Sequence, residues 1–121
     1  MTPDRSPHTL LPLTAVAFEI LLTLADGDCH GYHIMQEVGR RTNGAITLHP
    51  GTLYRALARL LEQDVIGEVA EEAVQPYKED VRRRYYRLTR FGRAVLVAEA
   101  ARLEQQVREA RARKLVGRQE R

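Results

Sequence analysis

The chain has 121 residues, of which 44% are hydrophobic and 29% are charged, a composition typical of a single soluble globular domain. Its formal charge of +3 is unevenly distributed, because residues 1–80 hold 6 Lys and Arg against 12 Asp and Glu, whereas residues 81–121 hold 13 against 4. No apolar run is long enough to span a membrane, and the single Cys29 excludes an internal disulfide. We therefore expect a protein of the reducing cytoplasm.

The first part of the chain predicts a short arm and then a helix. Residues 1–11 lack regular apolar spacing, which predicts a flexible arm that packs through Leu10 and Leu11 onto a partner. Thr14 is a good residue for a helix N-cap. Apolar residues then recur at helical spacing, at Val16, Ala17, Ile20, Leu21 and Leu24.

A second helix is predicted to begin near His30 and to end at about residue 39. Its apolar residues Ile34, Met35 and Val38 lie on one helical face. The Asn-Gly pair at positions 43 and 44 then predicts a turn. A short connector separates this turn from the next helix.

The third predicted helix, residues 50–61, has two chemically different faces. Pro50 suits its first position, because proline lacks the N–H that would have no helical partner there. The apolar face consists of Leu53, Leu57, Leu60 and Leu61. The polar face consists of Thr52, Arg55 and Arg59. Such a helix can enter a DNA groove; the alternative is a core helix with a solvated face, in which one arginine pairs with Glu62.

Two predicted strands follow, from about residue 68 and over residues 84–88, and they form a hairpin whose tip contains a proline. Alternation along the second strand places Tyr86 and Leu88 on its core face. Three helices followed by a hairpin indicate a mainly α (α+β) fold, the winged helix-turn-helix, with a two-stranded wing. The wing's backbone-contacting residues are expected to be Arg82, Arg83 and Arg84, unless the hairpin's own carboxylates neutralise them.

A long helix is predicted from residue 90 to about residue 115. Apolar residues recur along it at alternating steps of four and three, at Leu96, Ala100, Leu103, Val107 and Ala110. This spacing is typical of a coiled-coil seam and predicts dimerisation, although the helix can alternatively fold back onto its own domain. The predicted organisation is thus an arm (1–11), a DNA-binding domain (12–89) and a dimerisation helix with a tail (90–121).

Three motifs in this order also resemble a known family. The segments His30-Gly31-Tyr32, Pro50-Gly51-Thr52-Leu53-Tyr54 and Arg84-Tyr85-Tyr86-Arg87-Leu88-Thr89, with Gly92 after the last, are similar in order and spacing to the PadR family. The resemblance covers residues 13–96. It implies a prokaryotic homodimeric transcriptional regulator, usually a repressor, that leaves its operator when a small molecule or another signal arrives. The short C-terminal part resembles the compact branch of that family, which has a single dimerisation helix.

The resemblance and the predicted helix faces together define the expected sites. DNA contacts are expected from Tyr32, His49, Gly51, Thr52, Arg55, Arg59, Arg82, Arg83 and Arg84. Tyr32 has a family counterpart that meets the DNA backbone, with burial in the core as the alternative, whereas Tyr54 and Tyr86 are assigned to the core. His49 departs from the usual serine cap, so we expect weaker or pH-sensitive capping. An effector is expected at the dimer interface, between the first and the last helix, with Phe18 and Leu22 or residues of the seam lining its site.

The sequence favours no catalytic or metal-dependent function. Cys29, His30 and His33 are close together, but a third and fourth zinc ligand are not evident nearby, so we expect no metal and no cofactor. Phosphate-binding glycine loops and nucleophile elbows are absent from the sequence, and an enzyme is not expected. Two alternatives to an operator-binding regulator stay open: a winged-helix protein-interaction module and a non-specific architectural DNA binder. The regulator predicts near-palindromic operator DNA as partner.

Overall fold

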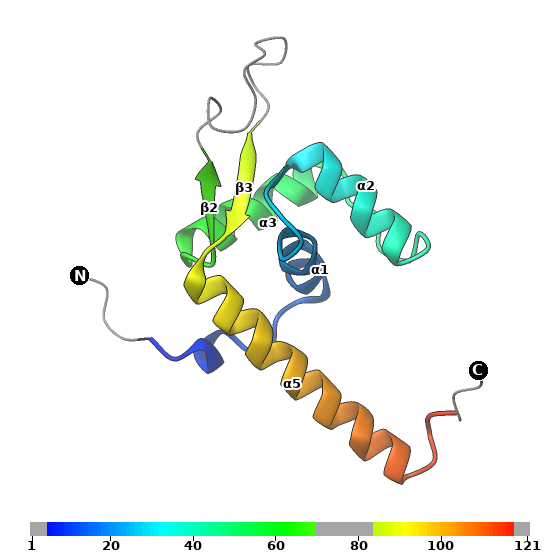
Figure 1. Cartoon of the computed structure of the whole chain (residues 1–121). Helices are drawn as coiled ribbons and strands as arrows, with labels where there is room; N and C mark the ends of the chain where they lie inside the picture. Colours follow the sequence, from blue (N-terminus) through cyan, green and yellow to red (C-terminus); the bar gives the residue numbers. More distant parts are fainter. Residues whose placement is uncertain (1–4, 70–83, 118–121) are drawn as a thin grey trace.

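The computed structural model describes residues 5–69 and 84–117. The described elements surround one hydrophobic core, and the last helix extends away from it (Figure 1). In chain order the elements are η1 (Pro7–Leu10), α1 (Ala15–Leu24), β1 (Cys29–His30), α2 (Gly31–Arg41), α3 (Pro50–Glu62), β2 (Ile66–Val69), β3 (Tyr85–Leu88) and α5 (Arg90–Ala112). The predicted mainly helical fold with a small antiparallel sheet is confirmed.

The helices begin where short polar side chains can bond the first backbone N–H groups. The hydroxyl oxygen of Thr14 accepts from Ala17 N–H at the start of α1, and that of Thr89 accepts from Gly92 N–H at the start of α5. Each cap satisfies a donor that has no partner inside the helix. Both helices therefore begin at defined residues, as the sequence predicts for α1.

The core is formed where the apolar faces of α1, α2, α3 and α5 meet the inner face of the sheet. The fully buried apolar members are Ile20, Leu21, Leu24, Ile34, Val38, Leu53, Leu57, Val65 and Val95. Tyr86 on β3 is 2% exposed, which confirms its assignment to the core. These contacts orient the outer face of α3 toward solvent.

The sheet has three strands in the order β1–β3–β2, all antiparallel, in place of the predicted two. Cys29 pairs with Tyr86 and His30 with Tyr85, so the residues just before α2 form an edge strand. The sequence prediction missed β1 because two residues are too few for alternation to be visible. This strand places the start of α2 beside the base of the wing.

The described part of the N-terminal segment is ordered against its own chain, which differs from the expected arm. Pro7–Leu10 forms the 3-10 helix η1, which contacts α5. Leu10 and Leu11 pack against the chain's own core and not onto a partner molecule, because α5 provides an apolar surface beside them. The guanidinium of Arg5 lies 4.4 Å from the ring centroid of Phe91 and donates to the carbonyl oxygen of Gln63.

Helix α5 has two parts with different surroundings. Its first half packs on the domain and buries Gly92, Val95, Leu96 and Glu99. Its second half extends away from the other helices, as the orange segment of Figure 1 shows, and ends at Ala112, three residues before the predicted end. In the described ranges no helix combines the length and apolar character that a membrane crossing requires.

Candidate nucleic-acid interface

Helix α3 presents a polar face that contains two exposed arginines. Leu53, Leu57 and Leu60 are buried, which confirms the predicted apolar face. Thr52, Arg55 and Arg59 are exposed on the other side. Among the residues that the structure describes, neither guanidinium has a hydrogen-bond or ion-pair partner, so Arg59 does not pair with Glu62. Both guanidiniums are therefore free to bind another molecule.

The start of α3 lacks a side-chain cap. His49 stands at the N-cap position and is exposed, but its side chain makes no capping hydrogen bond, as the predicted weaker capping implies. Gly51, in the first turn, is exposed as well. Uncapped N–H groups at a helix start favour an anion such as a phosphate. The two residues that were predicted to contact DNA here are thus accessible.

The start of α2 places two tyrosines on the same side of the molecule. Tyr32 is 60% exposed, which excludes the core alternative for this residue. Tyr54 is 46% exposed, so its assignment to the core was wrong. Its ring lies across Gly31, where an added Cβ would be 2.6 Å from the Tyr54 hydroxyl oxygen. Periodicity could have indicated this, because Tyr54 lies about 100° around α3 from Leu53.

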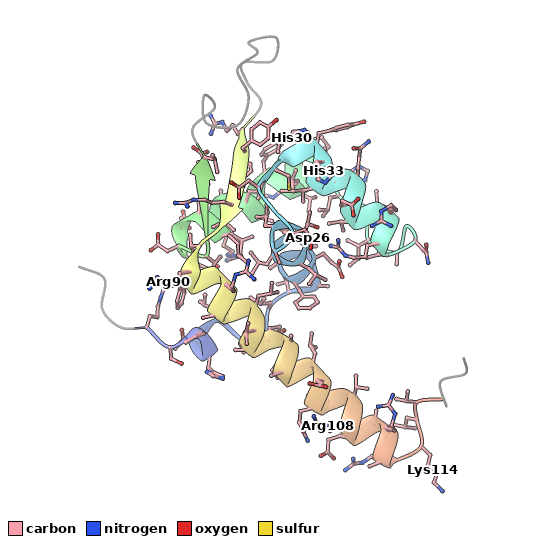
Figure 2. All side chains as sticks on the ribbon, in the orientation of Figure 1. Asp26, His30, His33, Arg90, Arg108 and Lys114 are labelled. Atoms are coloured by element: carbon pink, nitrogen blue, oxygen red, sulfur yellow. The ribbon has the colours of Figure 1, made fainter. Side chains whose placement is uncertain are left out.

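Helix α2 is capped by His30, a role that was not predicted from the sequence. The Nδ1 atom of His30 accepts from the backbone N–H of His33 at 3.2 Å. The His30 ring also meets the Tyr85 ring edge-on at a centroid distance of 5.3 Å. Because Tyr85 belongs to β3, these contacts join the start of α2, where Figure 2 labels His30 and His33, to the wing. The α2 start, α3 and the wing base therefore form one continuous region.

Only one residue of the predicted wing cluster lies within the described residues. Arg84 is exposed and its guanidinium donates to the carboxylate of Glu68 on β2 at 3.1 Å. Arg84 is thus paired with a carboxylate of the hairpin's first strand, and the acids between residues 70 and 83 lie outside the described residues. Arg82 and Arg83 lie outside the described residues. Exposed pairs of this kind are weak, about 0–1 kcal/mol, and phosphates can displace them.

The predicted seam of α5 divides into a buried and an open part. Leu96 is 7% exposed and belongs to the chain's own core, so it does not lie on the free surface of the helix. The remaining members are exposed or half-buried: Ala100, Leu103, Val107 and Ala110. Phe18 and Leu22, the expected effector residues, are half-buried on α1. The spacing of these residues alone could not show which part of the predicted stripe the domain itself covers.

Cys29 is a buried thiol at the edge of the sheet. Burial, together with the nearby Asp28, Glu37 and Asp26 carboxylates, raises the pKa of the Cys29 thiol from 9.0 to about 11. A thiol with this pKa is protonated at neutral pH and therefore reacts slowly. Within residues 5–69 and 84–117, no three His, Cys, Asp or Glu side chains are grouped so that they could hold a metal ion.

Comparison with known proteins places the chain among regulators of transcription. The sequence model of the "Transcriptional regulator PadR-like family" matches residues 20–98. The chain is 37% identical over 95 residues to the transcriptional regulator Rv3488 of Mycobacterium tuberculosis, covering 78% of this chain and 81% of that protein.

Solved structures agree with this placement. A transcriptional regulator from Clostridium thermocellum has a TM-score of 0.63 and 29% identity, over 84% of this chain and 90% of the other. A PadR family transcription regulator from Clostridium difficile has a TM-score of 0.67 over 82% of this chain and 97% of the other. Its 24% identity supports the fold alone.

Proposed function

Because the chain belongs to the PadR-like family of transcriptional regulators, we propose that it binds operator DNA by inserting α3 into the major groove. The observation that supports this proposal most directly is the outer face of α3, where Arg55 and Arg59 are exposed beside Thr52 and have no partner among the described residues. A guanidinium can bond the two acceptors of a guanine edge at once. Such a contact contributes about 1–3 kcal/mol of discrimination between bases.

The residues around α3 have the chemistry for positioning the duplex. Tyr32 and Tyr54 place hydroxyl groups near the start of α2, where backbone N–H groups also favour a phosphate. At the start of α3, beside the exposed His49 and Gly51, backbone N–H groups likewise favour a phosphate. Arg84 on the wing, together with Arg82 and Arg83, is proposed to contact the backbone. Phosphate contacts set the register, and base contacts provide specificity.

The proposed regulator is a homodimer. The open stripe of α5, from Ala100 to Ala110, is exposed or half-buried, and it lies on the part of the helix that extends beyond the domain (Figure 1). Packing two such helices about a two-fold axis places two α3 helices on one side of the assembly. Two half-sites about 34–36 Å apart, one duplex turn, then require a near-palindromic operator.

We further propose that the chain is a cytoplasmic repressor that an effector releases from DNA. Phe18 and Leu22 are half-buried on α1, which contacts α5, so a molecule bound near them can alter the angle between the two domains of a dimer. Such a molecule shifts the equilibrium only by its difference in affinity for the two arrangements.

The test is selection of bound sequences from a library of random duplexes. The wild-type protein is expected to enrich an inverted repeat, and the Arg55→Ala, Arg59→Ala double variant to enrich none. Arg111→Ala, an exposed arginine in the last turn of α5, is the matched control and is expected to select the same repeat. Absence of duplex binding even at low salt would indicate the protein-interaction alternative. Binding that unrelated DNA competes away equally would indicate an architectural protein.

A further inference from the structure

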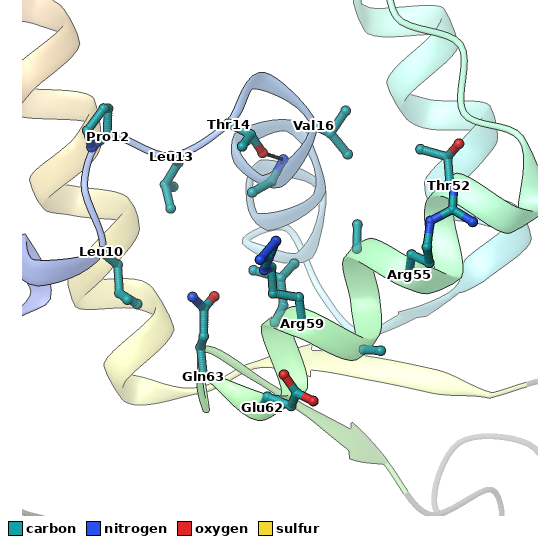
Figure 3. A pocket seen from close by; sticks show the side chains of 14 residues that line it. Leu10, Pro12, Leu13, Thr14, Val16, Thr52, Arg55, Arg59, Glu62 and Gln63 are labelled. Carbon is teal, nitrogen blue, oxygen red and sulfur yellow. Dashed lines mark hydrogen bonds between the residues drawn. The ribbon is translucent and has the colours of Figure 1, made fainter.

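An open groove of about 730 Å³ lies between the N-terminal segment and α3. We call it the α1–α3 groove; six residues between Leu10 and Ala17 line one side, and residues of α3 from Thr52 onward, with Gln63, line the other (Figure 3). Its volume lies within the range of small-molecule sites, about 300–1,000 Å³. Phe18 and Leu22, the residues expected to bind an effector, do not line it.

The two sides of the groove have apolar character near α1 and positive charge on α3. Leu10, Leu13 and Val16 form the apolar part. Figure 3 shows the Arg59 side chain extending from α3 toward α1, with the Gln63 amide pointing in the same direction. One long apolar surface with a cation and an amide at one side is suited to a molecule with an apolar body and an acidic group.

Among the described residues, the two arginines of the groove have no hydrogen-bond or ion-pair partner, whereas two half-buried arginines on other helices do. Arg41 on α2 donates to Glu19 and Thr23, and Arg102 on α5 donates to Glu99. Arg55 and Arg59 have no such partner among the described residues. Glu62 also lines the groove, but Figure 3 shows its carboxylate on the side of α3 away from the Arg59 guanidinium. The planar guanidinium fork is well matched to a carboxylate.

We propose that the α1–α3 groove binds an amphipathic organic acid, with its carboxylate on Arg59 and its apolar body against Leu13 and Val16. The consequence of this binding for regulation rests on the proposed function. Because Arg55 and Arg59 line the groove and also form the DNA-binding face of α3, a bound acid and operator DNA compete for the same guanidiniums. The acid thus removes the protein from DNA directly, without a change in the angle between subunits.

The first experiment measures binding of octanoate to the full-length protein without DNA, with 1-octanol as the uncharged counterpart. Octanoate is expected to saturate and to shift the amide resonances of Leu13 and Ala56. Octanol is expected to bind at least about tenfold more weakly, since a hydrogen bond to a charged group is lost. Equal affinities of the two compounds, or no saturation by octanoate at 10 mM, would overturn the proposal.

Variants locate the site. Arg59→Gln, which keeps a polar side chain but removes the charge, is expected to weaken octanoate about tenfold and to leave octanol unchanged. Ala56→Phe fills the groove and is expected to weaken both compounds, with an unchanged Tm as the check on folding. Arg111→Gln is the control with unchanged binding. Resonance shifts at Ala100 and Leu103 instead of Leu13 and Ala56 would place the acid on α5 and refute the groove.

The second experiment separates this inference from the proposed function. Octanoate is added to the complex of the wild-type protein with its selected duplex, and the duplex affinity is expected to fall as the groove fills. If octanoate binds in the groove but the duplex affinity is unchanged, the competition is refuted. If no duplex binds at all, the proposed function fails, and the first experiment still decides the groove.

Discussion

The carboxylate of Glu99 on α5 accepts the backbone N–H of Leu13 at 3.1 Å, across 86 positions of the sequence. The side chain of Glu99 is buried, and Arg102 donates to both of its oxygens at 2.6 and 3.0 Å. Leu13 lies just before α1, so this contact fixes the start of α1 against the proposed dimerisation helix. The buried carboxylate accepts three hydrogen bonds, two of them from a guanidinium, and a buried charge is tolerated when it is paired and hydrogen-bonded in this way.

Replacing Glu99 is expected to destabilise the domain. Glu99→Ala leaves the Leu13 N–H without its acceptor and is expected to lower the free energy of unfolding by about 1–3 kcal/mol. Glu99→Gln keeps an acceptor and is expected to cost less. Urea denaturation followed by circular dichroism measures both. An equal cost for the two variants would show that the charge on Glu99, and not the bond to Leu13, is what matters.

The same residue predicts a pH dependence. The hydrogen bonds from Arg102 hold the pKa of Glu99 below its ordinary value of 4.5, with the Leu13 N–H acting in the same direction against burial. A carboxyl with a lowered folded-state pKa stabilises the fold above its unfolded pKa, and this stabilisation is lost as pH falls through the folded pKa. The wild-type protein is therefore expected to lose more stability than Glu99→Gln below pH 4.5. Parallel stability curves down to acid pH would contradict this.

Two glycines predict opposite responses to alanine. A Cβ on Gly92 would collide with the backbone carbonyl of Val65, which already accepts from Thr89 N–H, so neither group can move cheaply. Gly92→Ala is expected to destabilise by more than about 3 kcal/mol. Gly39, inside α2, has open space around its Cβ position, and Gly39→Ala is expected to stabilise by about 0.5–1 kcal/mol. Thermal unfolding of both variants tests the pair.

The Cys29 thiol is expected to be inert at neutral pH. Since its pKa is about 11 in the folded chain and 9.0 ordinarily, alkylation by iodoacetamide should have its midpoint near pH 11 in buffer and near pH 9 in urea. Between these values the unfolded chain loses the proton first, so the free energy of unfolding falls as pH rises. In the Cys29→Ala variant, this decrease in the free energy of unfolding is expected to be absent. Rapid alkylation of the folded protein at pH 7 would contradict the assignment.

Removing the partner of Arg84 is expected to strengthen DNA binding. Glu68→Gln eliminates the carboxylate that competes with phosphates for this guanidinium. The duplex affinity should increase by up to about fivefold at low salt, which corresponds to the small free energy of an exposed ion pair. Glu104→Gln, on the exposed part of α5, is the control with the same change in charge. An equal increase in both variants would mean that only net charge matters.

The dimer is expected to depend on the open stripe of α5. Leu103→Glu with Val107→Glu places two charges where the second helix is proposed to pack, and sedimentation is expected to show a monomer that binds the duplex far more weakly. Val97→Glu changes an exposed residue (63%) that lies off the stripe and is expected to leave the dimer intact. A double variant that stays dimeric would place the interface elsewhere.

Local sequence determined most of the helical framework. Thr14 defines the start of α1 through a hydrogen bond to a backbone N–H three residues later, and Pro50 defines the start of α3 because it lacks an N–H. Both effects depend only on residues close together in the sequence. The spacing of Leu53, Leu57 and Leu60 determined which side of α3 is buried, and hence that Arg55 and Arg59 face solvent. The family resemblance rests on the same local motifs, and the match over residues 20–98 confirms it.

Only the tertiary structure decided what covers each apolar surface. Leu96 and Val107 belong to one periodic stripe. The domain buries Leu96 but leaves Val107 44% exposed, because α5 extends beyond the domain. Tyr54 lies over Gly31, and Cys29 pairs with Tyr86, through contacts between residues far apart in the sequence. Periodicity gives the direction of a side chain around its own helix or strand; its neighbour in space depends on how the whole chain packs.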